Sequence, residues 1–177
     1  FANAGYKIST NSTLSFYGRF DDHKTTGLNQ TYKTNLTTKI GNLTFGINHS
    51  TGLRNPSLYE LFGSADFNYK GNINLDPEKS KTNEIILTYD LQENLTIKST
   101  AYQATIFDRI EQTSNFRSYE NKKLDLNQEG LESELIFNDD NQKISIFTNF
   151  SKSKNTTGGP QLRRPDITYG TNYFKKD

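Results

Sequence analysis

The chain has 177 residues, of which 32% are hydrophobic and 12% aromatic, and its formal net charge is +1. The hydrophobic share is low for a packed globular domain, but the aromatic content and the near-zero net charge argue against intrinsic disorder. The balanced charge gives no indication of a nucleic acid or an acidic partner, and the absence of cysteine excludes disulfides and thiol chemistry.

Apolar and polar residues alternate along most of the chain, and this period of two predicts β-strands. The alternating segments lie at 12–21, 31–40, 43–48, 84–91, 131–137, 144–150 and 167–173. One face of each segment is apolar and uncharged, and the other carries most of the charged residues. We expect about eight full strands, with Phe1–Lys7 as the tail of a ninth. No apolar run approaches the ~20 residues of a membrane helix.

The segments between the strands alternate strictly in length. Short turns rich in Gly, Asn and Asp are expected at 40–43, 91–95 and 137–143. Longer links are expected at about 22–30, 53–81, 109–123 and 154–165. This series predicts an antiparallel meander with short turns at one end and long loops at the other.

Two all-β architectures fit this pattern: a soluble β-sandwich or lipocalin-like barrel, and an outer-membrane barrel that is apolar outside. Strands of about ten residues match the ~9–11 residues needed to cross a bilayer. Short turns at one end and long loops at the other are typical of membrane barrels, and the low hydrophobicity suits a wet lumen. The membrane barrel is therefore preferred. Because the chain stops at Phe174–Asp177, where a short turn should follow, we expect it to be part of a larger barrel.

Four segments occur in a characteristic order: "STGLRNPSLYELFG" (50–63), "GNINLDPEKSKTNEI" (71–85), "NQEGLESEL" (127–135) and "QLRRPDITYGTNY" (161–173). Together they resemble the C-terminal half of the barrel of TonB-dependent outer-membrane receptors, which include vitamin B12 and siderophore receptors. The resemblance covers roughly 43–173 and departs from the family pattern mildly at Asn55, Ile73 and Leu131. It implies that residues 1–177 form about eight to nine strands of a 22-stranded transmembrane barrel, without the plug domain and the final strands.

The resemblance assigns structural roles to several residues. Pro56 should end the strand that begins near Leu43, and 57–62 should form one or two helical turns with Leu58, Leu61 and Phe62 on the barrel rim. Asp76-Pro77-Glu78 should turn the chain back, with Glu84 facing the lumen. The family-motif residues are Pro56, Leu58, Glu60, Gly71, Asn72, Leu75, Pro77, Glu78, Ser80, Glu84, Gly130, Glu132, Arg164 and Pro165.

Glu132 and Glu134 lie two residues apart on the polar face of one strand. Paired carboxylates can act as an acid–base pair in a glycosidase, but we prefer ion pairs in the lumen wall. The cations available for such pairs are Lys33, Lys39, Lys98 and Arg19. The only histidines are His23 and His49, and the sequence has no nucleophile elbow and no metal-binding motif. We therefore expect no catalytic residue, no metal and no cofactor.

By resemblance, the whole protein would bind a scarce nutrient at extracellular loops, in the outer membrane of a Gram-negative bacterium. TonB and the inner-membrane energising complex would act through a missing N-terminal region that carries the plug and the TonB box. Outer-membrane lipid is the second expected partner. Residue type and loop position suggest the ligand contacts Arg54, Tyr59, Phe67, Tyr69, Phe116, Arg117, Tyr119 and Arg163.

The identity of the ligand stays open between a ferric siderophore, cobalamin, haem and a glycan. Haem is disfavoured because haem receptors of this family usually carry a histidine between the two loop motifs, and none lies between Arg54 and Leu75. Arg163 and Arg164 could grip an anionic ligand, although a role at the junction of loop and strand is preferred. The competing function is a passive porin or an adhesin barrel without energised transport, and a barrel hydrolase is disfavoured.

Overall fold

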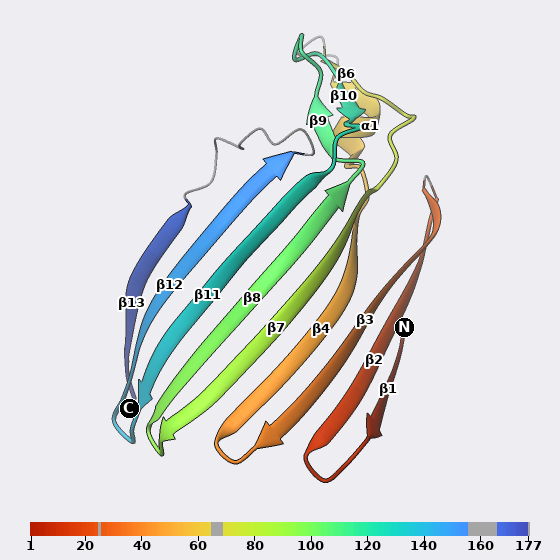
Figure 1. Ribbon diagram of the computed structural model, residues 1–177. Coiled ribbons are helices and arrows are strands. Elements are labelled where there is room, and N and C mark those ends of the chain that lie inside the picture. Colours follow the sequence, from red (N-terminus) through yellow and green to blue (C-terminus); the bar gives the residue numbers. More distant parts are fainter. Residues whose placement is uncertain (25, 65–68, 156–165, 177) are drawn as a thin grey trace.

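The computed structural model describes residues 1–24, 26–64, 69–155 and 166–176. Within them, nine strands form one antiparallel sheet in which every strand pairs with its neighbour in the order β1-β2-β3-β4-β7-β8-β11-β12-β13 (Figure 1). These strands are β1 (Ala2–Lys7), β2 (Ser12–His23), β3 (Gly27–Ile40), β4 (Leu43–Arg54), β7 (Glu78–Gln92), β8 (Leu95–Phe107), β11 (Leu126–Asn138), β12 (Gln142–Asn155) and β13 (Ile167–Lys175). The predicted all-β meander is confirmed, and its first strand is the expected ninth.

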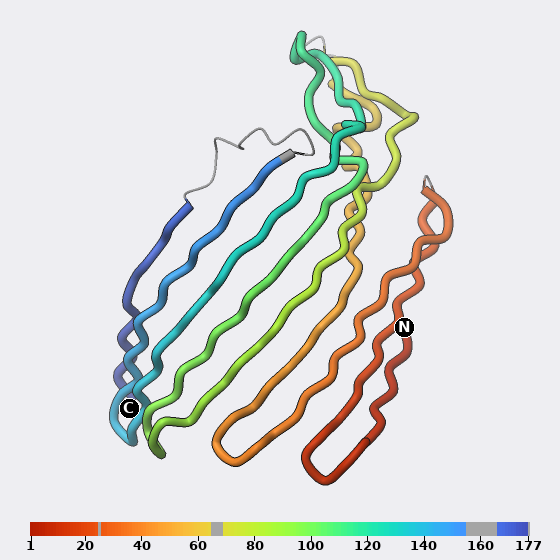
Figure 2. Tube along the Cα trace, viewed as in Figure 1, coloured from red at the N-terminus to blue at the C-terminus, as the bar shows by residue number. Residues whose placement is uncertain are grey.

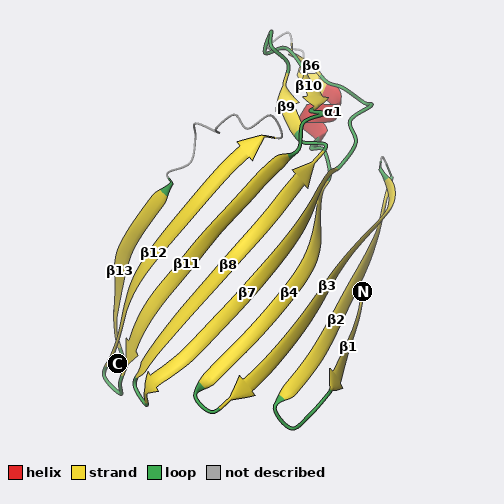
Figure 3. Ribbon diagram, in the orientation of Figure 1, coloured by secondary structure: helices red, strands yellow, loops and turns green. Residues whose placement is uncertain are grey.

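Five short elements complete the fold: α1 (Leu58–Phe62), β5 (Gly63–Ser64), β6 (Tyr69–Lys70), β9 (Ile110–Gln112) and β10 (Tyr119–Asn121). Figure 3 shows short turns at one end of the sheet, whereas α1 and the small strands gather at the other. No helix among the described residues is long and apolar enough to span a membrane.

The link predicted at 22–30 is wrong in length, because β2 and β3 extend into it until His23 pairs with Gly27. Gly27 adopts a φ of +69°, which favours glycine. The Asn29 side chain holds the turn by donating hydrogen bonds to Thr26 Oγ1 and Gly27 O, both at 3.1 Å. The long link predicted at 154–165 falls almost entirely outside the described residues.

The strand register brings most of the apolar residues of these strands to one face. Its clearest row runs across seven strands through residues that pair directly: Leu36, Ile47, Ile85, Ala101, Leu131, Phe150 and Ile167. We call this row, with the apolar side chains between it and the short-turn end, the apolar belt. The side chains of the belt are exposed; Leu87, for example, is 40% exposed and Leu131 is 43% exposed. A contiguous exposed apolar surface of this kind marks contact with another apolar phase.

The opposite face is polar, as predicted. Asn48 is buried there and donates a hydrogen bond to Glu84. Two aromatic side chains on this face lie over glycines of the neighbouring strand. A Cβ on Gly130 would come within 2.6 Å of the Tyr102 ring, and one on Gly170 within 2.6 Å of the Phe147 ring. The glycines therefore let these rings lie flat on the sheet.

The ion pairs predicted for Glu132 and Glu134 are not formed within the described part of the chain. Among the described residues, no ion pair within 4.0 Å involves either carboxylate, although Glu134 is the register partner of Lys98. Arg19 instead pairs with Asp21, two residues along its own strand, at 2.7 Å. A carboxylate on the same strand reaches the guanidinium more easily than one several strands away.

Candidate functional site

Two loops join into one structure at the loop end of the sheet. The first connects β4 to β7 and contains α1, β5 and β6, and the second connects β8 to β11 and contains β9 and β10. We define the loop body as residues 55–64, 69–77 and 108–125. Figure 2 traces both loops into the same cluster, and a backbone hydrogen bond of 2.8 Å from Lys70 N to Arg117 O connects them directly.

Helix α1 begins where the sequence predicted a strand end. Pro56 is buried, and Ser57 is an N-cap with a full capping box. The Ser57 hydroxyl accepts from Glu60 N at 3.2 Å, and the Glu60 carboxylate accepts from Ser57 N at 2.7 Å. This arrangement satisfies amides that a five-residue helix would otherwise leave open.

The expected packing of α1 is correct only for Leu61, which is 3% exposed. Leu58 and Phe62 are 73% and 63% exposed, so their predicted contact with the rim is wrong. Residues 58, 61 and 62 share one face of a helix, but Leu58 and Phe62 are the two end residues of α1 and stay exposed. Glu60 takes the second inward position.

Arg54, the last residue of β4, connects the helix to the first residue of β7. Its Nε lies 2.6 Å from Glu78 Oε2, and its Nη1 lies 3.2 Å from Glu60 Oε2. The second oxygen of Glu78 accepts a 2.7 Å hydrogen bond from Ile110 N in the other loop. Because two carboxylates occupy its guanidinium, Arg54 acts here as an anchor, in contrast to the ligand contact expected from sequence.

The electrostatics of the anchor follow from these contacts. Burial alone would raise the pKa of Glu78, but the hydrogen bonds from Arg54 and Ile110 N and the charge of Arg54 outweigh it and lower the pKa. The hydrogen bond to Glu78 in turn raises the pKa of Arg54, against the opposing effect of burial. Both groups are therefore charged at neutral pH.

Gly71 and Asn72 fasten the chain that returns from α1. A Cβ on Gly71 would lie 2.2 Å from Leu61 O, so only glycine fits this close approach. Asn72 N donates to Glu60 O at 2.9 Å, and its side-chain amide donates to Tyr119 O at 3.0 Å. These contacts explain why the "GNINL" segment needs its first two residues.

Asn121 is a further connection that the sequence analysis missed. Its side-chain amide donates to Asp76 O at 2.9 Å and Asp108 O at 2.6 Å, and its Oδ1 accepts from Asp76 N at 2.8 Å. Its partners are up to 45 residues away, and no local pattern marks one asparagine among many. A small apolar core of Leu61, Leu75 and Ile110, with Tyr119 against it, completes the loop body.

Three tyrosines predicted to contact ligand lie together in the loop body. The Tyr59 and Tyr69 rings stack with centroids 4.7 Å apart, and Tyr119 meets Tyr69 edge-on at 5.4 Å. Tyr69 is buried, and burial, together with the nearby Tyr119, raises its pKa, so it stays a neutral phenol. Tyr59 is 45% exposed and presents the open side of the stack.

Phe116 and Arg117 form the tip of the second loop. Phe116 has a φ of +57° and is 72% exposed. Asn115 Oδ1 supports the tip by accepting hydrogen bonds from Thr113 Oγ1 at 2.7 Å and Arg117 N at 3.1 Å. The Arg117 side chain is exposed and has no ion pair among the described residues. The loop tip thus exposes an aromatic ring and a cation at two consecutive residues.

The remaining expected residues have different places. Phe67, Arg163, Arg164 and Pro165 lie outside the described residues. On β7, Ser80 faces Gly52, where a Cβ would come within 2.5 Å of the serine hydroxyl. In the described part of the chain, no three His, Asp or Glu side chains are grouped to hold a metal ion.

Comparisons with known proteins agree with this architecture. The family model described as "TonB dependent receptor-like, beta-barrel" matches residues 1–176. No curated protein sequence matches at a significant level.

Three solved structures illustrate the likeness of fold. The siderophore receptor PirA from Pseudomonas aeruginosa is 22% identical with a TM-score of 0.74, and the match covers 84% of this chain and 30% of that one. PirA from Acinetobacter baumannii is 17% identical with a TM-score of 0.78, covering 97% and 30%. The ferric-catecholate import receptor Fiu from Escherichia coli K12 is 15% identical with a TM-score of 0.72, covering 93% and 30%. The chain thus spans about a third of the length of these proteins.

Proposed function

We propose, from the premise that this chain belongs to the TonB-dependent receptor-like β-barrel family, that it is part of an outer-membrane receptor that imports a scarce nutrient. The match of the family model over residues 1–176 carries this proposal. In this assignment the apolar belt faces lipid, the polar face lines the barrel lumen, and the loop body faces the outside of a Gram-negative cell. Transport needs no covalent chemistry, so the chain is not proposed as an enzyme.

The loop body supports a ligand that carries aromatic rings and negative charge. The exposed edge of the tyrosine stack at Tyr59 and the ring of Phe116 offer flat apolar surfaces, and aromatic pairs favour such stacking. Arg117 adds an open cation with a planar, forked set of donors suited to carboxylates and phenolate-type oxygens. A ferric siderophore combines these features, so we favour it over cobalamin, a glycan or haem.

The anchor beneath this surface gives the loop residues fixed positions. Arg54, Glu78 and Asn121 hold the two loops together without using Tyr59, Phe116 or Arg117. Pre-organised contacts lose less conformational entropy on binding. Phe67 and Arg163 stay in the proposal as ligand contacts on the grounds of residue type and position in the sequence.

The test measures uptake of radiolabelled ferric siderophores and of labelled cobalamin by cells that carry or lack the whole receptor, under iron limitation. We expect uptake of one ferric chelate to require the receptor, and Phe116→Ala with Arg117→Ala to weaken its binding. Glu120→Gln, on the same hairpin, is the matched control. If the cells take up only cobalamin, the proposed receptor function stands, and the ligand is cobalamin instead of a ferric siderophore.

The competing function is a passive porin or adhesin barrel. The two differ in their need for energy, because TonB and the inner-membrane complex drive the family's transport. We expect uptake to stop in a strain without TonB and after addition of a protonophore. Uptake that continues in both conditions would refute energised transport, whichever ligand is carried.

A further inference from the structure

The sheet opens between β3 and β4 toward the loop end. The two strands pair only from Lys33–Ser50 to Ile40–Leu43. Beyond this point, β3 pairs only with β2 and β4 only with β7, and Figure 1 shows the strands diverging. The Thr51 hydroxyl closes the lower end of the opening by accepting from Tyr32 N at 2.9 Å and donating to Tyr32 O at 3.4 Å. At the upper end, Thr26 Oγ1 donates to Asn55 Oδ1 at 3.1 Å.

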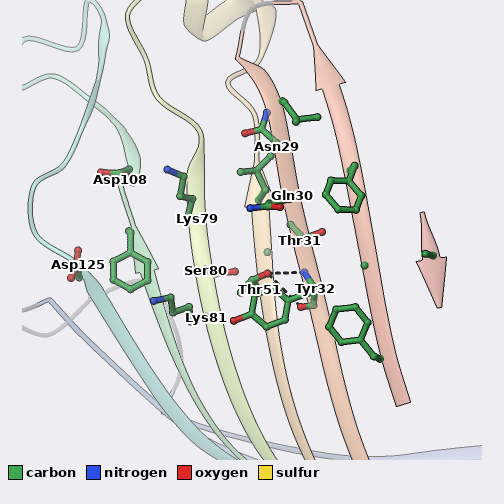
Figure 4. Close-up of a pocket in the computed structure, with 18 residues that line it drawn as sticks. Asn29, Gln30, Thr31, Tyr32, Thr51, Lys79, Ser80, Lys81, Asp108 and Asp125 are labelled. Atoms are coloured by element: carbon green, nitrogen blue, oxygen red, sulfur yellow. Dashed lines mark hydrogen bonds between the residues drawn. The ribbon is translucent and has the colours of Figure 1, made fainter. Parts of the chain in front are cut away.

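A pocket of about 900 Å³ lies over this opening (Figure 4). Its apolar lining comes from Phe16, Phe20, Leu28 and Tyr32 on the β2–β3 side and from Leu53 and Phe107 on the other. By register, these side chains lie on the same sheet face as Leu36 and Ile85 of the apolar belt. The pocket therefore continues the belt toward the loops rather than opening from the polar face.

Two lysines of β7 also line the pocket. Lys79 and Lys81 lie on this face of the sheet, and Lys81 Nζ is 5.5 Å from the centre of the Phe107 ring. Both side chains are exposed, and neither has an ion pair among the described residues. Asp108 and Asp125 lie on the side away from β3, so the lysines stand between these carboxylates and the apolar side chains of β2 and β3, which we call the apolar wall (Figure 4).

The height of the lysines relative to the apolar belt identifies the kind of partner. Lys81 is four residues above Ile85, which corresponds to ~13 Å along a strand. Lysines at this level can extend to the headgroup layer while their stems stay on apolar surface. An acyl chain lying on the belt would reach the apolar wall from below, and its headgroup phosphate would then lie beside both ammonium groups.

We propose that this pocket binds a phosphorylated membrane lipid, with the phosphate on Lys79 and Lys81 and an acyl chain against Phe16, Phe20 and Leu28. Inorganic phosphate would leave the apolar wall uncovered, and a lipid without phosphate would leave the lysines unpaired. An added protein strand would need the free edges of β3 and β4, but Thr51 already occupies the beginning of the β3 edge. The site does not depend on the imported nutrient.

The experiment uses native mass spectrometry of the whole receptor, purified and exchanged into defined lipids. The probes are phosphatidylglycerol, diacylglycerol without phosphate, and inorganic phosphate. Because other parts of the barrel also bind lipid, the measured quantity is the affinity difference between the wild type and Lys79→Ala/Lys81→Ala. We expect about 30-fold weaker binding of one phosphatidylglycerol, since each lysine near a membrane surface contributes about a five-fold factor. Lys33→Ala/Lys39→Ala, on the polar face, should change nothing.

A second variant is expected to change the affinity for phosphatidylglycerol in the opposite direction. Asp108→Asn removes a negative charge beside the lysines, and its φ of +53° is one that asparagine tolerates. We expect it to tighten phosphatidylglycerol binding several-fold. The proposal is overturned if the double lysine variant keeps the wild-type affinity, if diacylglycerol binds as well as phosphatidylglycerol, or if inorganic phosphate competes fully. Weaker binding in Asp108→Asn would also contradict it.

Discussion

The anchor at Glu78 gives the sharpest test of the loop body. In Glu78→Gln the side chain keeps its length, and its oxygen can still accept the hydrogen bond from Ile110 N. Its amide group, however, would face Arg54 Nε, so two donors would replace the present contact of 2.6 Å. The ion pair that joins the two ends of the first loop is therefore lost, and the hydrogen bond from Ile110 N in the second loop goes to a neutral acceptor instead of a charged one.

The size of the effect follows from the contacts that remain. Hydrogen bonds to charged groups contribute ~1.5–3 kcal/mol. Arg54 is half exposed and keeps Glu60, so we expect a loss around or below the lower limit of that range, about 1–2 kcal/mol. This corresponds to a roughly 5- to 30-fold larger population of molecules in which the two loops of the loop body have separated. The sheet should keep its stability, because strand pairing does not use this carboxylate.

The measurement is amide hydrogen exchange, followed by mass spectrometry on the whole receptor in nanodiscs. Peptides that cover 108–123 should exchange about 5- to 30-fold faster in Glu78→Gln, and peptides from β11 and β12 should not change. Glu120→Gln is the control, since among the described residues the Glu120 carboxylate pairs with Lys122 at an exposed position. Unchanged exchange at 108–123, or an equal increase throughout the sheet, would refute the role of Glu78 as a local anchor.

Three further predictions test other parts of the structure. Gly71→Ala should destabilise the loop body by about 1–3 kcal/mol, because the added Cβ would clash with the backbone at Leu61. Limited proteolysis of the loop body should therefore become faster. Gly5→Ala is the control and should have no effect, because the space around Gly5 is empty. Leu87→Arg should cost ~2–4 kcal/mol of barrel stability in bilayers if it lies near the midplane, whereas Thr88→Arg on the polar face should cost far less. Equal losses of stability in urea unfolding would contradict the face assignment. The folded-state pKa of Glu78 is lowered, so the stabilisation by its carboxylate is present above the ordinary pKa of 4.5 and is lost as pH falls below that value. Amide hydrogen exchange in the loop body, corrected for its intrinsic rate, should therefore rise below about pH 4.5 in the wild type. It should not rise in Glu78→Gln.

The sequence predicted the strands well where one face of the sheet is apolar and the other is polar. Within the apolar belt, side chains such as Leu87 and Thr88 face different surroundings, so alternation is strong. Nearer the loops, residues 78–83 of β7 and 29–31 of β3 are polar on both faces, so the alternation fades although the strands continue. This explains why 31–40 was predicted where β3 spans Gly27–Ile40, and 84–91 where β7 spans Glu78–Gln92.

The site was predictable in its parts but not in its connections. Pro56, Gly71 and Glu78 were recognisable from their motifs, and the loop tyrosines from residue type. The stacking of Tyr59 on Tyr69 and the three hydrogen bonds of Asn121 depend on how two loops meet, which no local pattern records. Arg54 shows the same limit, because its two carboxylate partners come from a helix and from the next strand.

At the start of β7, two consecutive residues belong to the two proposed sites, because successive side chains of a strand point to opposite faces of the sheet. Glu78 lies on the polar face and holds the loop body, whereas Lys79 lies on the apolar face and lines the lipid pocket. At the loop end β4 and β7 stay paired as far as Arg54 and Glu78, whereas β3, which begins at Gly27, pairs with β4 only from Lys33 onward. A lipid could therefore widen the opening between β3 and β4 without disturbing the anchor. Changes at Lys79 should then alter lipid binding and leave nutrient binding intact, and changes at Glu78 should do the reverse.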